Sequence, residues 1–85
     1  MEKDMKEIGK VTHFFDKISV AVVELTDSLE VGDKIKIKGT TTDFEQEVKE
    51  MQIEHQKIEK AKAGDLIGLK VEEKVRVNDK VYLLG

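Results

Sequence analysis

The sequence predicts an all-β fold, a small antiparallel barrel, from three features of its 85 residues. A Gly-Asp or Asn-Asp pair precedes a β-prone segment three times, at residues 32–33, 64–65 and 78–79. Each pair marks a turn, because Gly and Asn tolerate positive φ and Asp hydrogen-bonds to nearby backbone. Residues 34–38 alternate strictly between Lys and Ile, and the chain has no Pro that would exclude a strand from the sheet interior.

The first 25 residues contain two predicted strands. Residues 7–15 are β-prone, with Gly9 permitting a bend or a close contact. Apolar residues alternate from Ile18 to Val22, but Val23 and Leu25 have the opposite parity. Such a change within a strand is typical of a bulge, and bulges help a sheet to curl. We expect residues 1–5 to be a disordered tail and residues 6–85 to form a single domain.

Three further segments have a clear inward face. In 34–38 the alternation places Ile35 and Ile37 in the core and three lysines in water. Residues 66–71 direct Ile67, Leu69 and Val71 inward, and 81–84 form the closing strand. Leu29, within the polar loop 26–30, is expected to tuck beneath that loop.

Residues 43–60 give conflicting signals. Apolar residues and His55 recur there at helical spacing, and Thr42 with Glu45 matches a helix capping box. If the segment is a strand, Phe44, Gln46 and Val48 share one face. Local signals alone favour a helix for residues 44–58, but they are not strong enough to exclude a strand.

Composition limits the function classes. The net charge of −3 argues against strong non-specific binding of nucleic acid. The chain has no Cys and no apolar run long enough to cross a membrane, and its charged first residues lack the apolar core of a signal peptide. We therefore expect a cytoplasmic protein. Fourteen Lys, a single Arg and many Glu resemble the composition of a thermophilic surface.

The candidate site residues are basic or aromatic. Three lysines of one strand, joined by a basic pair from a later loop, are candidates to follow a phosphate backbone; these are Lys34, Lys36, Lys38, Lys74 and Arg76. The alternative is the solvent face of an edge strand, where lysines discourage aggregation. Either Phe14 or Phe15 must point outward from a regular strand. We take Phe14 as a candidate interface anchor, and the alternative is that the outward ring lies under the loop 26–31.

The residues give no support for catalysis or for a cofactor. His13 and His55 are half of a metal site at most, and the chain has no Cys to complete one. Ser19 and Ser28 lack the Gly-x-Ser-x-Gly context of a nucleophile. The chain has no phosphate-binding loop, since Gly9-Lys10 is followed by Val and lacks the upstream glycine, so we expect no GTP binding.

Taken together, the turn and strand motifs resemble the second-domain β-barrel of translational GTPases of the elongation factor Tu and initiation factor two type. The matching residues include Leu29, Val31-Gly32-Asp33, Ile35, Val48, Glu50-Met51, Ala61, Ala63-Gly64-Asp65, Ile67-Gly68-Leu69 and 77–83. The resemblance covers about residues 7–84 and implies a closed barrel of six to seven strands. It also implies a strand from Val48 to Ile53, followed by an irregular connection through residues 56–62. Asn78 departs from the pattern, which has a glycine in the last turn.

The resemblance implies a non-catalytic binding module that engages RNA or a translation-factor partner. The motifs are also similar to the small C-terminal barrel of collagenase-like bacterial peptidases. The alternative function is therefore an accessory or lid subunit of a separately encoded peptidase of that kind. A homo-oligomer with a structural role is a third possibility. In each case we expect a protein partner and no membrane.

Overall fold

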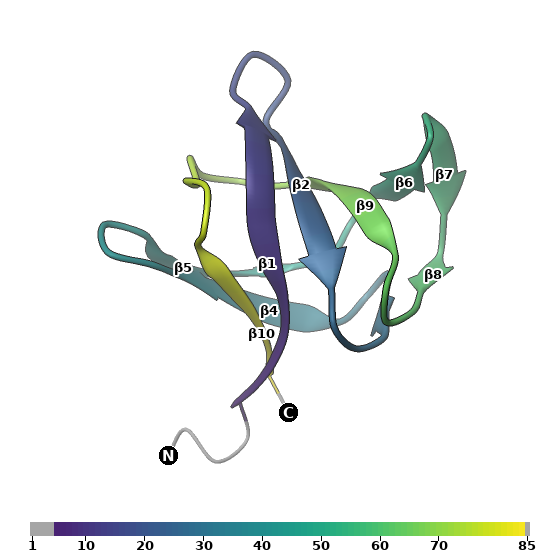
Figure 1. Ribbon diagram of the computed structural model, residues 1–85, viewed down its shortest axis with the longest axis horizontal. Coiled ribbons are helices and arrows are strands. Elements are labelled where there is room, and N and C mark those ends of the chain that lie inside the picture. Colours follow the sequence, from purple (N-terminus) through teal and green to yellow (C-terminus); the bar gives the residue numbers. More distant parts are fainter. Residues whose placement is uncertain (1–4, 85) are drawn as a thin grey trace.

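In the computed structural model, which describes residues 5–84, the chain forms β-strands joined by turns and short loops (Figure 1). The strands are β1 (Met5–Phe15), β2 (Val20–Leu25), β3 (Leu29–Glu30), β4 (Lys34–Lys38), β5 (Asp43–Glu47), β6 (Met51–Ile53), β7 (Gln56–Ile58), β8 (Lys60–Ala61), β9 (Leu66–Lys70) and β10 (Lys80–Leu84). The prediction of an all-β fold is confirmed. Of the predicted tail 1–5, residues 1–4 lie outside the described part, and Met5 pairs with Leu84.

Eight strands form one antiparallel sheet in the order β5-β4-β10-β1-β2-β9-β6-β7, and β3 pairs with β8 in a second, two-stranded sheet. The large sheet is strongly curved, with β4 and β5 crossing behind β1 and β2 (Figure 1). Within residues 5–84 its terminal strands, β5 and β7, share no ladder. The prediction of a closed barrel of six to seven strands is therefore corrected to a curled open sheet with a small second sheet.

One continuous core fills the inside of the curl. It consists of buried side chains from almost every strand: Ile8, Val11, Ala21, Val23, Leu25, Leu29, Ile35, Ile37, Val48, Met51, Ala61, Ile67, Leu69, Val71, Val75 and Val81. The predicted inward faces of 34–38 and 66–71 are confirmed, because strict alternation leaves one face available for burial. Leu29 is also buried as predicted, although it lies in the short strand β3.

The three predicted turns share one hydrogen-bonding pattern. In each turn the Asp backbone N–H donates to the carbonyl three residues earlier, and the Asp carboxylate accepts from that residue's N–H. The residue before each Asp has a positive φ: 99° at Gly32, 93° at Gly64 and 78° at Asn78. Asn78 replaces the glycine of the last turn because Asn tolerates the left-handed conformation better than most residues do.

The bulges lie in β1 and not in the segment 18–25. The register of β1 shifts between Glu7 and Gly9 against β10, and between Val11 and His13 against β2. Each shift lets residues three apart face the same side, so Ile8 and Val11 are both buried. In β2 the odd-numbered residues face the core from end to end, and Ala21 contributes to that face. The predicted bulge near Val23 is wrong. Ala21, Val23 and Leu25 alternate regularly on the core side, but Ala21 is small and was not counted as part of that inward face.

The ambiguous segment 43–60 is β-structure. Phe44, Gln46 and Val48 share the inward side, as the strand interpretation predicts. The strand predicted from Val48 to Ile53 is present only at residues 51–53, because Val48 leaves the ladder to bond with Gly32 and Asp33. The predicted irregular connection 56–62 contains strands β7 and β8. Strand pairing over a buried face therefore overrides the helical pattern here.

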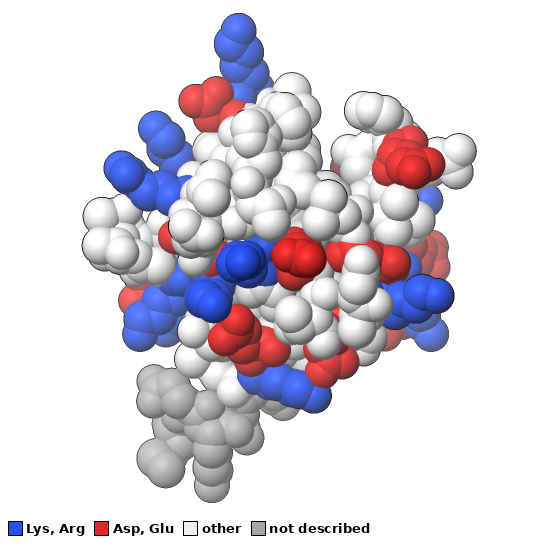
Figure 2. Space-filling model, viewed as in Figure 1, with Lys and Arg blue, Asp and Glu red and all other residues white. Residues whose placement is uncertain are grey.

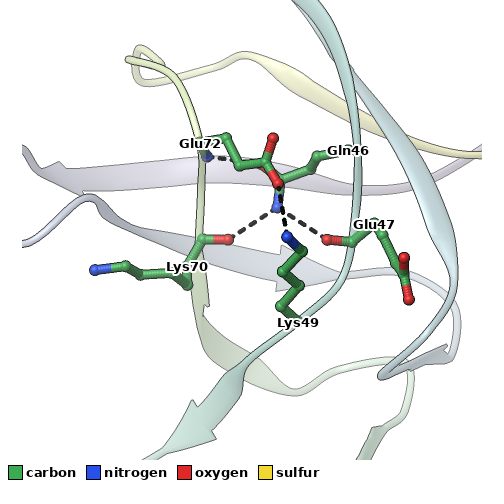
Figure 3. A network of polar contacts seen from close by, with 5 residues as sticks. All are labelled: Gln46, Glu47, Lys49, Lys70 and Glu72. Carbon is green, nitrogen blue, oxygen red and sulfur yellow. Dashed lines mark hydrogen bonds and ion pairs between the residues drawn. The ribbon is translucent and has the colours of Figure 1, made fainter.

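A buried glutamine links the edge strand β5 to the end of β9 (Figure 3). The Gln46 side-chain amide donates to the Lys70 carbonyl at 2.9 Å and to the Glu47 carbonyl at 3.4 Å. Its carbonyl oxygen accepts from the Glu72 backbone N–H at 2.8 Å. On the surface nearby, Lys49 forms an ion pair with Glu72. The Gln46 side chain thus joins the two sides of the curled sheet where no backbone ladder does.

Candidate functional site

The predicted lysine strand faces a strand of carboxylates. In the β4–β5 pairing Lys34 lies opposite Glu47, and Lys36 lies opposite Glu45. Lys38 lies opposite Asp43, whose carboxylate forms a 3.4 Å ion pair with Lys36. The Lys36 side chain is only 18% exposed. Alternating charges of opposite sign weaken the field that would attract a phosphate backbone.

The later basic pair, Lys74 and Arg76, is exposed in the loop between β9 and β10. Arg76 begins the last Asp turn, which packs against Gly39 just after β4. The structure therefore brings Arg76 and Lys38 to the same end of β4. Among the ion pairs of residues 5–84, none involves Lys74 or Arg76. Their role in binding a partner or RNA stays a prediction.

The outward aromatic ring is Phe15 rather than Phe14. Phe14 is half-buried and packs against the core, whereas Phe15 is 48% exposed. The bulge at Thr12 determines which ring faces inward, because it places Phe14 on the same side of the strand as Val11. The exposed His13 ring contacts Phe15 edge-on, with ring centroids 4.4 Å apart.

An apolar groove of about 220 Å³ lies beside Phe15 on the outer face of β2 and β9. Its walls and floor are Phe15, Ile18, Val20, Val22, Gln52, Glu54, His55, Leu66, Ile67 and Gly68. Figure 2 shows an uncharged surface over this part of β1 and β2, hollowed toward the β6–β7 hairpin. Phe15, Ile18 and Leu66 are three of the five large apolar residues that the described part of the chain exposes. We call this site the Gly68 groove.

Strand register explains the hollow. On the outer face Val22 lies opposite Gly68, which in turn lies opposite Gln52 on β6. Gly68 has no side chain, and a Cβ there would come within 3.3 Å of both Gln52 Cγ and Val20 Cγ1. Its φ is not in the left-handed region, so backbone conformation does not require glycine here. The Gly68 backbone, which carries no side chain, therefore forms the floor between the two walls.

The polar wall of the Gly68 groove is the β6–β7 turn. Ile53 pairs with Gln56, which leaves Glu54 and His55 as a two-residue loop with φ of 51° and 68°. Two successive residues with positive φ are usually Asn-Gly, and other residues cost about 1–2 kcal/mol each in this conformation. The turn thus holds a carboxylate and an imidazole at the groove despite an unfavourable backbone. Sequence reasoning did not find this wall, because the β6–β7 hairpin itself was hidden by the helical pattern.

Three further properties belong to the described residues outside the groove. Among residues 5–84, no three His, Cys, Asp or Glu side chains are grouped to hold a metal ion. In the same part of the chain, no helix is long and apolar enough to cross a membrane. The pKa of Asp27, outside the groove, is lowered by a hydrogen bond from Lys6, by the Ser28 backbone N–H and by the Lys6 charge.

The chain is similar in sequence to part of several proteases. It is 49% identical over 79 residues to an uncharacterised protease of Methanocaldococcus jannaschii, covering 92% of the chain and 19% of the relative. A collagenase of Porphyromonas gingivalis is 42% identical over 77 residues, covering 88% of the chain and 21% of the relative. The chain thus spans about a fifth of the length of these relatives. No protein-family profile matches it.

The fold also occurs in a solved structure. The crystal structure of the C-terminal domain of a protein described as a U32 peptidase, from Geobacillus thermoleovorans, superimposes with a TM-score of 0.88. The match covers 94% of this chain and 93% of that domain at 16% identity, so it shows the fold alone.

These comparisons correct the prediction of a translation-factor module. The relatives are named as a protease and collagenases, and the similarity to a collagenase-like C-terminal barrel is the one that the comparisons support. The motif from Ala63 to Leu69 suggested the wrong family because it specifies only a turn and which side chains of the next strand face the core. Proteins with different functions meet those two structural requirements with the same residues.

Proposed function

We propose that this chain is a non-catalytic accessory module that docks on the catalytic part of a collagenase-like peptidase and acts there as a lid or a substrate-presenting surface. The observation that carries the proposal is the 49% identity, over nearly the whole chain, to a fifth of a protease. That proportion matches a module attached to a larger catalytic part. The Gly68 groove gives the module an apolar surface suited to such a contact.

The arrangement of the molecule supports docking as one body. Core side chains join nearly all strands, and Gln46 links β5 to β9 in addition. A pre-organised surface binds with little loss of conformational entropy, which favours a stable lid or platform over a flexible tether. The Asp turns contribute to this rigidity by fixing three of the strand connections.

Affinity purification from native cells tests the proposal. The tagged chain is recovered under native conditions, and its partners are identified by mass spectrometry. We expect a collagenase-like peptidase at near-stoichiometric amount. The purified peptidase is then assayed on gelatin with and without the chain, and the chain is expected to change the cleavage rate while cleaving nothing by itself. Recovery of translation factors or tRNA without a peptidase would contradict the proposal.

A further inference from the structure

The Gly68 groove has the size and composition of a pocket for a single anchoring side chain. Its volume of about 220 Å³ is below the roughly 300–1,000 Å³ of pockets that bind small molecules. Three exposed apolar side chains, Phe15, Ile18 and Leu66, surround a floor formed by Gly68. An apolar centre bordered by polar residues is the usual arrangement at the core of a protein interface.

The charge at the groove has one sign. Among the lining residues Glu54 is the only carboxylate, and no Lys or Arg lines the groove. On the apolar side, the Lys70 ammonium donates a hydrogen bond to the Ile18 carbonyl at 2.8 Å. On the polar side Lys57 lies opposite Gln52 and is exposed. No ion pair within residues 5–84 involves Glu54, so its carboxylate is available to a partner.

The backbone at Glu54 is a second sign of a binding role. Glu54 and His55 occupy left-handed positions where Asn-Gly would be favoured, and both side chains line the groove. Unfavourable backbone conformations of this kind are concentrated at ligand clamps and active sites. The strained turn, the single carboxylate and the apolar floor all meet in one place.

We propose that the Gly68 groove receives an aromatic or large aliphatic side chain from the peptidase, and that a Lys or Arg next to it in the peptidase pairs with Glu54. This inference rests on the proposed function and names the surface through which docking occurs. The anchor residue lies over Gly68 between Val22 and Gln52. The cation lies against the β6–β7 turn, where Glu54 provides the complementary charge.

Calorimetry with the recovered peptidase tests the surface. Leu66→Ser removes an apolar wall, and Glu54→Lys reverses the charge; we expect each to weaken binding at least tenfold. Val77→Ser is the matched control, because Val77 is 53% exposed but does not line the groove, and it is expected to bind like the parent chain. Lys57→Gln controls for a general charge effect and is expected to bind as tightly or more tightly. Melting temperatures check that every variant is folded.

The outcomes distinguish a failure of the proposed function from a failure of the docking surface. If the parent chain does not bind the peptidase, the proposed function fails and the docking surface fails with it. If the parent binds and Leu66→Ser and Glu54→Lys bind equally well, only the groove inference is overturned.

A peptide titration followed by NMR tests the groove without the peptidase. Acetyl-Gly-Lys-Phe-Lys-Gly-amide is expected to shift the amide signals of Gln52, Glu54 and Gly68, and to do so less in Glu54→Lys. The same peptide with Glu in place of both Lys residues is expected to leave these signals unchanged. Equal shifts with both peptides, or none with either, would refute the chemistry assigned to the groove.

Discussion

Replacing Gln46 tests how the curled sheet is held together without a closing ladder. Gln46→Leu keeps a side chain of similar volume but removes the amide that bonds to Lys70 and Glu72. Each of these bonds contributes about 0.5–1.5 kcal/mol net, so we expect a loss of about 1–3 kcal/mol in the free energy of unfolding. The third contact, to Glu47, is long at 3.4 Å and adds little.

Urea denaturation measures this loss, and thermal unfolding checks it. For a domain of this size about 1 kcal/mol corresponds to a shift of about 4–8 °C in Tm. Amide exchange adds a local readout, since the Glu72 N–H loses its acceptor in Gln46→Leu and should exchange faster. Amides in the β1–β2 ladder should exchange at an unchanged rate as long as local opening dominates.

Two further variants make the test specific. Lys49→Gln breaks the neighbouring ion pair with Glu72, whose side chains are 69% and 52% exposed, and is expected to change stability by less than about 0.5 kcal/mol. Gln46→Glu replaces the amide N–H₂ with an oxygen that faces the Lys70 carbonyl. Its destabilisation relative to the parent chain should narrow as the pH falls toward about 4, where the carboxyl regains a proton to donate. If Gln46→Leu has the same free energy of unfolding as the parent chain, Gln46 does not link the two sides of the sheet.

Three other perturbations follow from the turns and from the shifted carboxyl group. Gly39→Ala places a Cβ against the buried Asp79 carboxylate and should destabilise by about 1–3 kcal/mol in urea, whereas an unchanged midpoint would contradict this contact. Gly64→Ala meets no atom within 4 Å but has φ of 93°, so calorimetry should show a loss of about 1–2 kcal/mol from backbone strain alone; no loss would disprove this strain. The pKa of Asp27 is lowered in the folded chain. Its contribution to the free energy of unfolding is therefore present above the unfolded pKa of 3.8 and is lost as the pH falls through the folded pKa. In Lys6→Met the Asp27 carboxyl should titrate at higher pH by NMR, and an unchanged midpoint would exclude Lys6 as the cause.

Local sequence signals predict those parts of the fold that depend on single strands and single turns. The alternation of Ile35 and Ile37 with lysines predicts their burial, and a positive-φ residue before Asp predicts a turn. The bulges of β1 were not predictable, because they appear only as a register between partners distant in sequence. The same holds for Gln46, whose partners Lys70 and Glu72 are 24 and 26 residues away.

The candidate site was harder to predict than the fold, for a physical reason. The groove combines side chains from the β1–β2 hairpin, β9 and the β6–β7 turn, and it exists only once these strands are in register. The basic residues that sequence reasoning selected stand out by charge, yet Lys36 is largely covered and paired with Asp43. Phe14 was selected as the outward ring, but the bulge at Thr12 places Phe14 inward and Phe15 outward.

Residues 66–69 serve the scaffold and the candidate site at the same time. Ile67 and Leu69 are fully buried in the core, and because strand side chains alternate, Leu66 and Gly68 must lie on the outer face. The φ of Gly68 lies outside the left-handed region, so backbone conformation does not explain the glycine. The neighbours Gln52 and Val20 lie so close that even a methyl group would begin to fill the hollow. Glycine at this position therefore avoids a close contact with these two side chains and leaves the groove open.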